Sequence, residues 1–201
     1  MSKLISIGVD PGSSNGAVAI IDSNLNILKL TYAPYYLIRS RTKQNKKKLN
    51  KETMLYEKDF RAFKWSDYKE IGNILRPFVS KNTDIIYTIE RVGSRKGEGE
   101  HSSFVFGNSF GIFQGQYSLL NPIKYYEPLP TQWKPELGVT SDKNTSIELA
   151  KEIFTNSMKE QDIKIKKSED DLAEALLIAF YGLKCYIEEI EDNDNGTKEE
   201  N

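Results

Sequence analysis

Short apolar runs separated by polar turns dominate the first part of the chain. Residues 3–10, 16–22 and 27–33 each gather apolar side chains over the length of a strand, and a polar turn precedes the last of them. Runs this short, bounded by glycine, asparagine and aspartate, predict β-strands. The pattern therefore predicts an antiparallel meander of three strands at the N-terminus.

Helical spacing and short apolar runs alternate through the rest of the sequence. They predict helices at about 66–80, 103–120, 142–158 and 168–190, and strands at 84–90 and 122–127. Thr140 or Ser141 is expected to cap the third of these helices. This order of elements predicts the α/β class, with a mixed sheet in which the antiparallel meander joins parallel strands and helices flank both.

Residues 34–60 show no clear period and are rich in tyrosine. Basic residues gather there without an acid among them: Arg39, Arg41, Lys43, Lys46, Lys47, Lys48 and Lys51. Such a run is common in solvated loops, and it can equally bind phosphates. We expect a single domain over residues 1–190, with this segment as a basic insertion, and an acidic, disordered tail at 191–201.

Composition, charge and cysteine content limit the class of protein that the chain can be. The chain has 201 residues, of which 38% are apolar and 28% are charged, which suits one soluble domain. Its net charge of −1 divides unevenly, because residues 188–201 carry −6 and the remainder carries +5. Cys185 is the only cysteine, so a disulfide within the chain is excluded and an intracellular, cytoplasmic location is expected. No apolar run reaches the roughly 18–20 residues that cross a bilayer, so no membrane partner is expected.

Carboxylates stand where predicted elements begin or end. Asp10 closes the first strand, before a glycine-rich turn, and Glu90 closes the strand that follows the first helix. Asp171 and Glu174 lie three residues apart in the last helix and therefore share one face. Asp170 is an alternative to Asp171 on that face. Small and apolar residues continue the same face, so we expect it to pack on the sheet.

Each acid alone has an ordinary explanation, since acidic residues in the first turn of a helix commonly complement its dipole. Their coincidence at the ends of several elements favours a shared site. Hard divalent cations prefer carboxylate oxygens, and two of them roughly 3.5–4 Å apart can promote phosphodiester hydrolysis. The sequence has no cluster of His and Cys that would bind a softer metal.

Four motifs, in order, resemble the RuvC group of Holliday-junction resolvases within the RNase H-like superfamily. They are Ile7-Gly8-Val9-Asp10-Pro11-Gly12 with Gly16, Ile89-Glu90, Pro130-Thr131-Gln132-Trp133-Lys134 with Gly138 and Lys143, and Asp171-Leu172-Ala173-Glu174-Ala175-Leu176-Leu177-Ile178-Ala179. Many bacterial members have Asp where Glu174 stands, so the chain looks closer to phage and other viral branches. The segments at 39–51 and 93–102 look longer than in compact bacterial enzymes.

The resemblance implies a metal-dependent endonuclease that resolves four-way junctions and needs no small-molecule cofactor. Asp10, Glu90, Asp171 and Glu174 would bind two Mg²⁺ ions, with Mn²⁺ as a substitute. Hydrolysis of the scissile phosphodiester would leave 5′-phosphate and 3′-hydroxyl ends. Two basic residues are implied to contact phosphate at the catalytic site, namely Lys134 and Lys143.

The resemblance also implies a homodimer on branched DNA, formed mainly by the helix after Glu90. The spacing of Gly107, Gly111 and Gly115 predicts one face of that helix pressed against another backbone, and this face would suit the dimer. The residues expected to contact DNA are Arg39, Arg41, Lys43, Lys46, Lys47, Lys48, Arg95, Lys96, Phe104 and Phe106. The two phenylalanines fit either wedges at the junction centre or ordinary core packing. His101 is expected to be a passive surface residue, and Trp133 to be packed in the core.

Other functions remain open at this point. A nuclease of the same fold could act on flaps, forks or RNA–DNA hybrids, because the metal chemistry would be identical. A non-catalytic junction-binding protein could share the fold, although all four candidate carboxylates are present here. Actin-like kinases and ATPases begin with a similar strand and turn, but they need a longer chain with a second phosphate-binding turn, which this sequence lacks.

Overall fold

The computed structural model describes residues 2–12, 16–41, 49–50, 55–56, 60–93 and 99–199. The strands are β1 (Lys3–Asp10), β2 (Ala17–Asp22), β3 (Ile27–Tyr32), β4 (Tyr35–Arg41), β5 (Leu49–Asn50), β6 (Leu55–Tyr56), β7 (Phe60–Ser66), β8 (Thr83–Ile89) and β9 (Lys124–Tyr126). The helices are α1 (Tyr68–Leu75), followed by a 3₁₀ turn at Arg76–Phe78, and α2 (Glu100–Leu120), α3 (Pro130–Glu136), α4 (Lys143–Ile153), α5 (Thr155–Glu160) and α6 (Asp170–Glu199).

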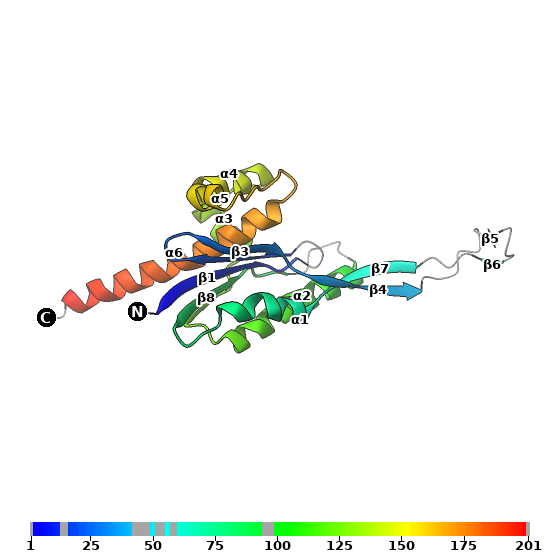
Figure 1. Ribbon diagram of the computed structural model, residues 1–201, viewed down its shortest axis with the longest axis horizontal. Coiled ribbons are helices and arrows are strands. Elements are labelled where there is room, and N and C mark those ends of the chain that lie inside the picture. Colours follow the sequence, from blue (N-terminus) through cyan, green and yellow to red (C-terminus); the bar gives the residue numbers. More distant parts are fainter. Residues whose placement is uncertain are drawn as a thin grey trace.

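The central sheet has five strands in the order β3-β2-β1-β8-β9. β1 pairs antiparallel with β2, and β2 pairs antiparallel with β3. β8 joins β1 in parallel, and β9 joins β8 in parallel. In Figure 1 the sheet lies between two helical layers, with α3 to α6 on one face and α1 and α2 on the other. The predicted α/β class and mixed sheet are confirmed.

Alternation along the strands divides the apolar residues between two cores. Ile5, Ile7 and Val9 of β1 face α1 and α2, and they pack in one buried cluster with Phe113. Ser6, Gly8 and Asp10 therefore face α6 on the other side. This alternation decides the position of Asp10, because it turns the last residue of β1 toward the N-terminal half of α6.

Small residues let α6 lie against β1 with little space between them. A Cβ added at Gly8 would lie 2.2 Å from the backbone nitrogen of Ala179 and 2.3 Å from the carbonyl oxygen of Ala175. Ser6 Oγ donates a hydrogen bond of 2.7 Å to the carbonyl oxygen of Ala179. A Cβ at Gly182 would likewise meet Thr88 Oγ1 of β8, at 1.8 Å. These contacts fix the height of α6 above the strands.

β4 and β7 form a separate two-stranded antiparallel arm, paired from Tyr35 with Ser66 to Arg41 with Phe60. The arm projects from the end of the central sheet (Figure 1). Ser66 Oγ and Ser109 Oγ of α2 are hydrogen-bonded at 2.7 Å and buried, which anchors the root of the arm to that helix. The sequence predicted no regular element in residues 34–60, and the structure corrects this with β4, β5, β6 and the start of β7.

Other boundaries also differ from the prediction. α4 begins after Asp142, whose side chain accepts a hydrogen bond from the backbone N–H of Asn144, so the cap is neither Thr140 nor Ser141. The helix predicted at 142–158 is two helices, divided at Phe154. α6 continues to Glu199, through residues where an acidic, disordered tail was expected. None of the helices among the described residues is both long and apolar enough to cross a membrane.

Candidate active site

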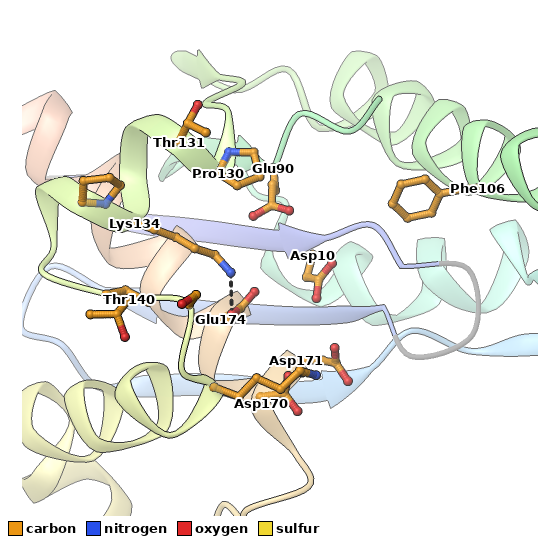
Figure 2. Close-up of a pocket in the computed structure, with 14 residues that line it drawn as sticks. Asp10, Glu90, Phe106, Pro130, Thr131, Lys134, Thr140, Asp170, Asp171 and Glu174 are labelled. Carbon is orange, nitrogen blue, oxygen red and sulfur yellow. Dashed lines mark hydrogen bonds and ion pairs between the residues drawn. The ribbon is translucent and has the colours of Figure 1, made fainter. Parts of the chain in front are cut away.

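One pocket of about 580 Å³ opens where β1 and β8 end and α6 begins. Side chains from far apart in the sequence line it, and Figure 2 shows their acidic groups around a common space. It brings together all six residues predicted to be catalytic: Asp10, Glu90, Lys134, Lys143, Asp171 and Glu174. Asp170 and Phe106 line the same pocket.

The parallel pairing of β1 with β8 places two of these acids side by side. Val9 is paired with Ile89, so the residues that follow, Asp10 and Glu90, emerge at the same edge of the sheet. The backbone N–H of Glu90 donates to the carbonyl oxygen of Val9 at 3.0 Å. The Asp10 carboxylate in turn accepts a hydrogen bond of 3.3 Å from the backbone N–H of Gly12, at the start of the turn.

The first turns of α6 supply the remaining acids. Asp171 and Glu174 both act electrostatically on Asp10, as expected for residues on the face that meets the sheet. Asp170 is almost fully buried and is bound by Lys143 Nζ at 2.5 Å. Asp171 is therefore the residue that groups with Asp10 and Glu174, while Asp170 has a lysine partner of its own.

The pocket concentrates negative charge. Burial raises the pKa of Asp10 well above its ordinary range, and the charges of Glu90, Asp171 and Glu174 raise it further. Burial and the charge of Asp170 also raise the pKa of Asp171, against the opposing effect of Lys143. Two neighbouring acids with raised pKa values mark a site in which a cation would stabilise the ionised carboxylates.

Basic and neutral donors of the chain hold three of the acids. Lys134 Nζ lies 2.6 Å from Glu174 Oε1, as the dashed line in Figure 2 marks. Lys143 holds Asp170, and Trp133 Nε1 donates to Glu90 Oε2 at 2.8 Å. Both lysines for which the resemblance implied phosphate contacts are paired with a carboxylate at the edge of the pocket. Trp133 is a core residue, as predicted, and its bond to Glu90 was not foreseen.

The acids surround the pocket without meeting at one point. Within the described part of the chain, no three His, Cys, Asp or Glu side chains form a group that could hold a metal ion as it stands. The chemistry of the donors nevertheless fits a hard divalent cation, since all four candidate ligands are carboxylates and Asp10 lies among like charges. Binding would require at least some of these carboxylates to turn toward a common centre.

The residues expected to contact DNA fall into three groups. Phe106 lines the pocket, whereas Phe104 is 64% exposed and meets Trp65 of the arm edge-on, with ring centroids 5.8 Å apart. Arg39 and Arg41 lie on β4. Those outside the described residues are Lys43, Lys46, Lys47, Lys48, Arg95 and Lys96, and the side chain of His101 is likewise not described.

Among the described residues, no backbone lies against the glycines of α2. A Cβ added at Gly107, Gly111 or Gly115 would have no neighbouring atom within 4 Å. The close packing expected on this face of α2 stays a prediction.

Comparisons with known proteins support the fold. No protein-family model matches the sequence, and no curated protein is significantly similar to it. A solved structure of Thermus thermophilus RuvC in complex with a Holliday junction substrate is similar over 88% of this chain and 91% of that one, with a TM-score of 0.50 and 14% identity. A second Thermus thermophilus RuvC structure covers 88% and 92%, with a TM-score of 0.47 and 14% identity. The first match confirms a RuvC-like, RNase H-like fold.

Proposed function

We propose that this protein is a structure-selective DNA endonuclease that resolves four-way junctions by metal-dependent hydrolysis. The convergence of Asp10, Glu90, Asp171 and Glu174 on one pocket carries the proposal, because such a set of carboxylates suits divalent cations and phosphodiester chemistry. The similar RuvC structure, which holds a Holliday junction substrate, supports four-way junctions as the substrate class.

The four carboxylates would hold two Mg²⁺ ions, or Mn²⁺ in their place. Bound there, such ions would supply the Lewis acid and the activated water of an in-line hydrolysis that leaves 5′-phosphate and 3′-hydroxyl ends.

Lys134 and Lys143 would bind the phosphate groups next to the scissile bond. Both cations already lie at the pocket, and each is a hydrogen-bond donor now paired with a carboxylate. Lys143 has a side chain that is 74% exposed, so it can exchange Asp170 for a phosphate oxygen without leaving water. A phosphodiester entering the pocket would therefore meet two positive partners beside the four acids.

The active form would be a homodimer, joined through α2, so that two pockets make paired nicks across one junction. The open face at Gly107, Gly111 and Gly115 supports this, because a helix without side chains at one face can approach a second helix closely. Sedimentation of the free protein should then give twice the 23.0 kDa of one chain. A monomer at concentrations that cleave junctions would contradict it.

The deciding experiment compares DNA structures. A labelled four-way junction is incubated with the protein in Mg²⁺, in Mn²⁺ and in EDTA, beside duplex, Y-fork, flap and RNA–DNA hybrid of the same sequences. We expect paired, ligatable nicks in the four-way junction with either metal and none in EDTA. Preferential cleavage of another structure would favour a different nuclease of this fold. Tight binding of the junction without cleavage would favour a non-catalytic binding protein.

Arg39 and Arg41 of β4 should contribute to DNA affinity. Changing Arg39 and Arg41 together to Gln should weaken junction binding and reduce the slope of log affinity against log salt by up to about 2, since each lost phosphate contact removes about 0.9. The matched control changes Lys3 and Lys81 together to Gln, since both lie at the opposite end of the central sheet from the pocket. An unchanged slope in the arm variant would mean that these arginines are only solvated.

A further inference from the structure

We propose that Trp133 and Ser146 are positioning residues, whose buried donors fix the orientation of Glu90 and Glu174 in the pocket. The proposal rests on the function proposed above, because it concerns two carboxylates of the same site. Neither residue lines the pocket, and each touches a carboxylate that does. Both donors come from the helical layer beside α6, through α3 and α4.

Trp133 is suited to hold a carboxylate in one orientation. Its side chain is completely buried in the core beneath α6, so the indole ring cannot turn. The indole N–H is a donor only, and it lies 2.8 Å from Glu90 Oε2. A hydrogen bond to an ionised carboxylate is roughly twice as strong as one between neutral groups, so this contact restrains Glu90 while the core restrains the tryptophan.

Ser146 plays the same part for Glu174. Its side chain is 1% exposed, on the face of α4 that packs against α6. Ser146 Oγ donates to Glu174 Oε1 at 3.1 Å, and Lys134 Nζ binds the same oxygen at 2.6 Å. Two donors from different helices thus converge on one oxygen atom. If Lys134 moves to a phosphate, Ser146 still donates to Glu174 and maintains the orientation of its carboxylate.

The arrangement joins four elements that the chain brings together only by folding. Glu90 follows β8, Glu174 lies on α6, and the donors stand on α3 and α4. Partners of this kind behind metal-binding side chains typically contribute 10–100-fold to metal affinity or activity. We therefore assign to α3 and α4 the task of holding two of the four acids at fixed angles.

The experiment measures metal binding to the DNA-free protein. Trp133→Phe and Ser146→Ala should each weaken Mn²⁺ binding, measured by calorimetry, by about 10-fold or more. The matched controls are Phe154→Leu, a fully buried residue of the same core, and Ser157→Ala, a buried serine whose hydroxyl bonds the backbone of Ile27. Both controls should lower thermal stability and leave Mn²⁺ affinity within about 2-fold of wild type.

A spectroscopic signature distinguishes positioning from general loosening. The indole N–H resonance of Trp133, assigned by its absence in Trp133→Phe, should shift when Mg²⁺ is added, and that of Trp65 should not. In Glu90→Gln the Mg²⁺ response of this resonance should disappear, which tests the contact without altering the tryptophan. Wild-type Mn²⁺ affinity in both Trp133→Phe and Ser146→Ala, or no metal binding by the wild type, would overturn the inference.

The two proposals fail separately. If the wild type cleaves no branched DNA but Trp133→Phe and Ser146→Ala bind Mn²⁺ more weakly than it does, the nuclease proposal is refuted and the positioning role stands. Wild-type protein that cleaves junctions, with unaltered metal affinity in both variants, would refute the positioning role alone.

Discussion

Replacing Asp10 with asparagine should reduce junction cleavage by at least about 100-fold, because it removes a charged ligand from the centre of the acidic pocket. The same change should raise the thermal stability of the metal-free protein by a few degrees. Asp10 is buried among Glu90, Asp171 and Glu174, so its ionised form is unfavourable when no cation is bound. Loss of activity together with a gain in stability is the pattern of a functional charge rather than of a structural one.

The stability gain should depend on pH in a defined direction. The pKa of Asp10 in the folded protein lies above its ordinary value of 3.8. The stability that the neutral carboxyl contributes is therefore complete below that value, and it is lost as the pH rises through the folded pKa. Asparagine stays neutral throughout, so its advantage over aspartate should be larger at pH 7.5 than at about pH 4.5.

Thermal denaturation in EDTA at both pH values, and again with Mg²⁺ at pH 7.5, measures these effects. Mg²⁺ should stabilise the wild type more than Asp10→Asn, because a ligand that binds only the folded state raises its stability. Asp162→Asn is the matched control, since Asp162 is exposed and its φ of 50° suits asparagine. Cleavage by Asp10→Asn at the wild-type rate would refute the proposed role of Asp10.

Alanine at Gly8 should destabilise the protein by at least about 2–3 kcal/mol, at the upper end of what overpacking usually costs. The added Cβ would lie 2.2 Å from the backbone nitrogen of Ala179, and neither β1 nor α6 has a flexible side chain there that could yield. The melting temperature should therefore fall by roughly 5–10 °C. Cleavage should fall as well, because α6 carries Asp171 and Glu174 and must move away from Asp10.

Thermal and urea denaturation of Gly8→Ala measure this cost. The matched control is Gly72→Ala on α1, where the nearest atom to an added Cβ is Gln116 Oε1 at 3.5 Å, an ordinary contact. A helical glycine replaced by alanine should be neutral or stabilising by up to about 1 kcal/mol. Wild-type stability in Gly8→Ala would mean that α6 does not lie as close to β1 as these contacts require.

The elements with strong local patterns could be predicted from the sequence. β1, β2, β3 and β8 are short apolar runs with clear ends, and these ends place Asp10 and Glu90 at the close of two strands. The spacing of Asp171 and Glu174 likewise predicted that both side chains lie on the face of the last helix that packs on the sheet. Asp10 and Glu90 come together because neighbouring parallel strands end at the same edge of a sheet.

Features that depend on tertiary contacts could not be predicted in this way. α3 was not among the predicted helices, although Pro130 stands at its first position, where proline is favourable. The arm lacks the clean alternation of a half-buried strand, so its pairing was missed. The bonds of Trp133 and Ser146 to the carboxylates join residues more than twenty positions apart and leave no local trace in the sequence.

The two ends of the molecule differ in one further respect. In Figure 1 the arm projects at one end, and the C-terminal turns of α6 project at the other. β4 and β7 include Arg39, Arg41, Arg61 and Lys64 in their sequences, whereas the last part of α6, residues 188–199, includes six acids and one lysine. The chain is thus an electric dipole along its long axis. A polyanion such as DNA would orient the protein with the arm toward it before any contact forms. Salt near 0.1 M, with a Debye length of about 10 Å, would limit this effect to short distances.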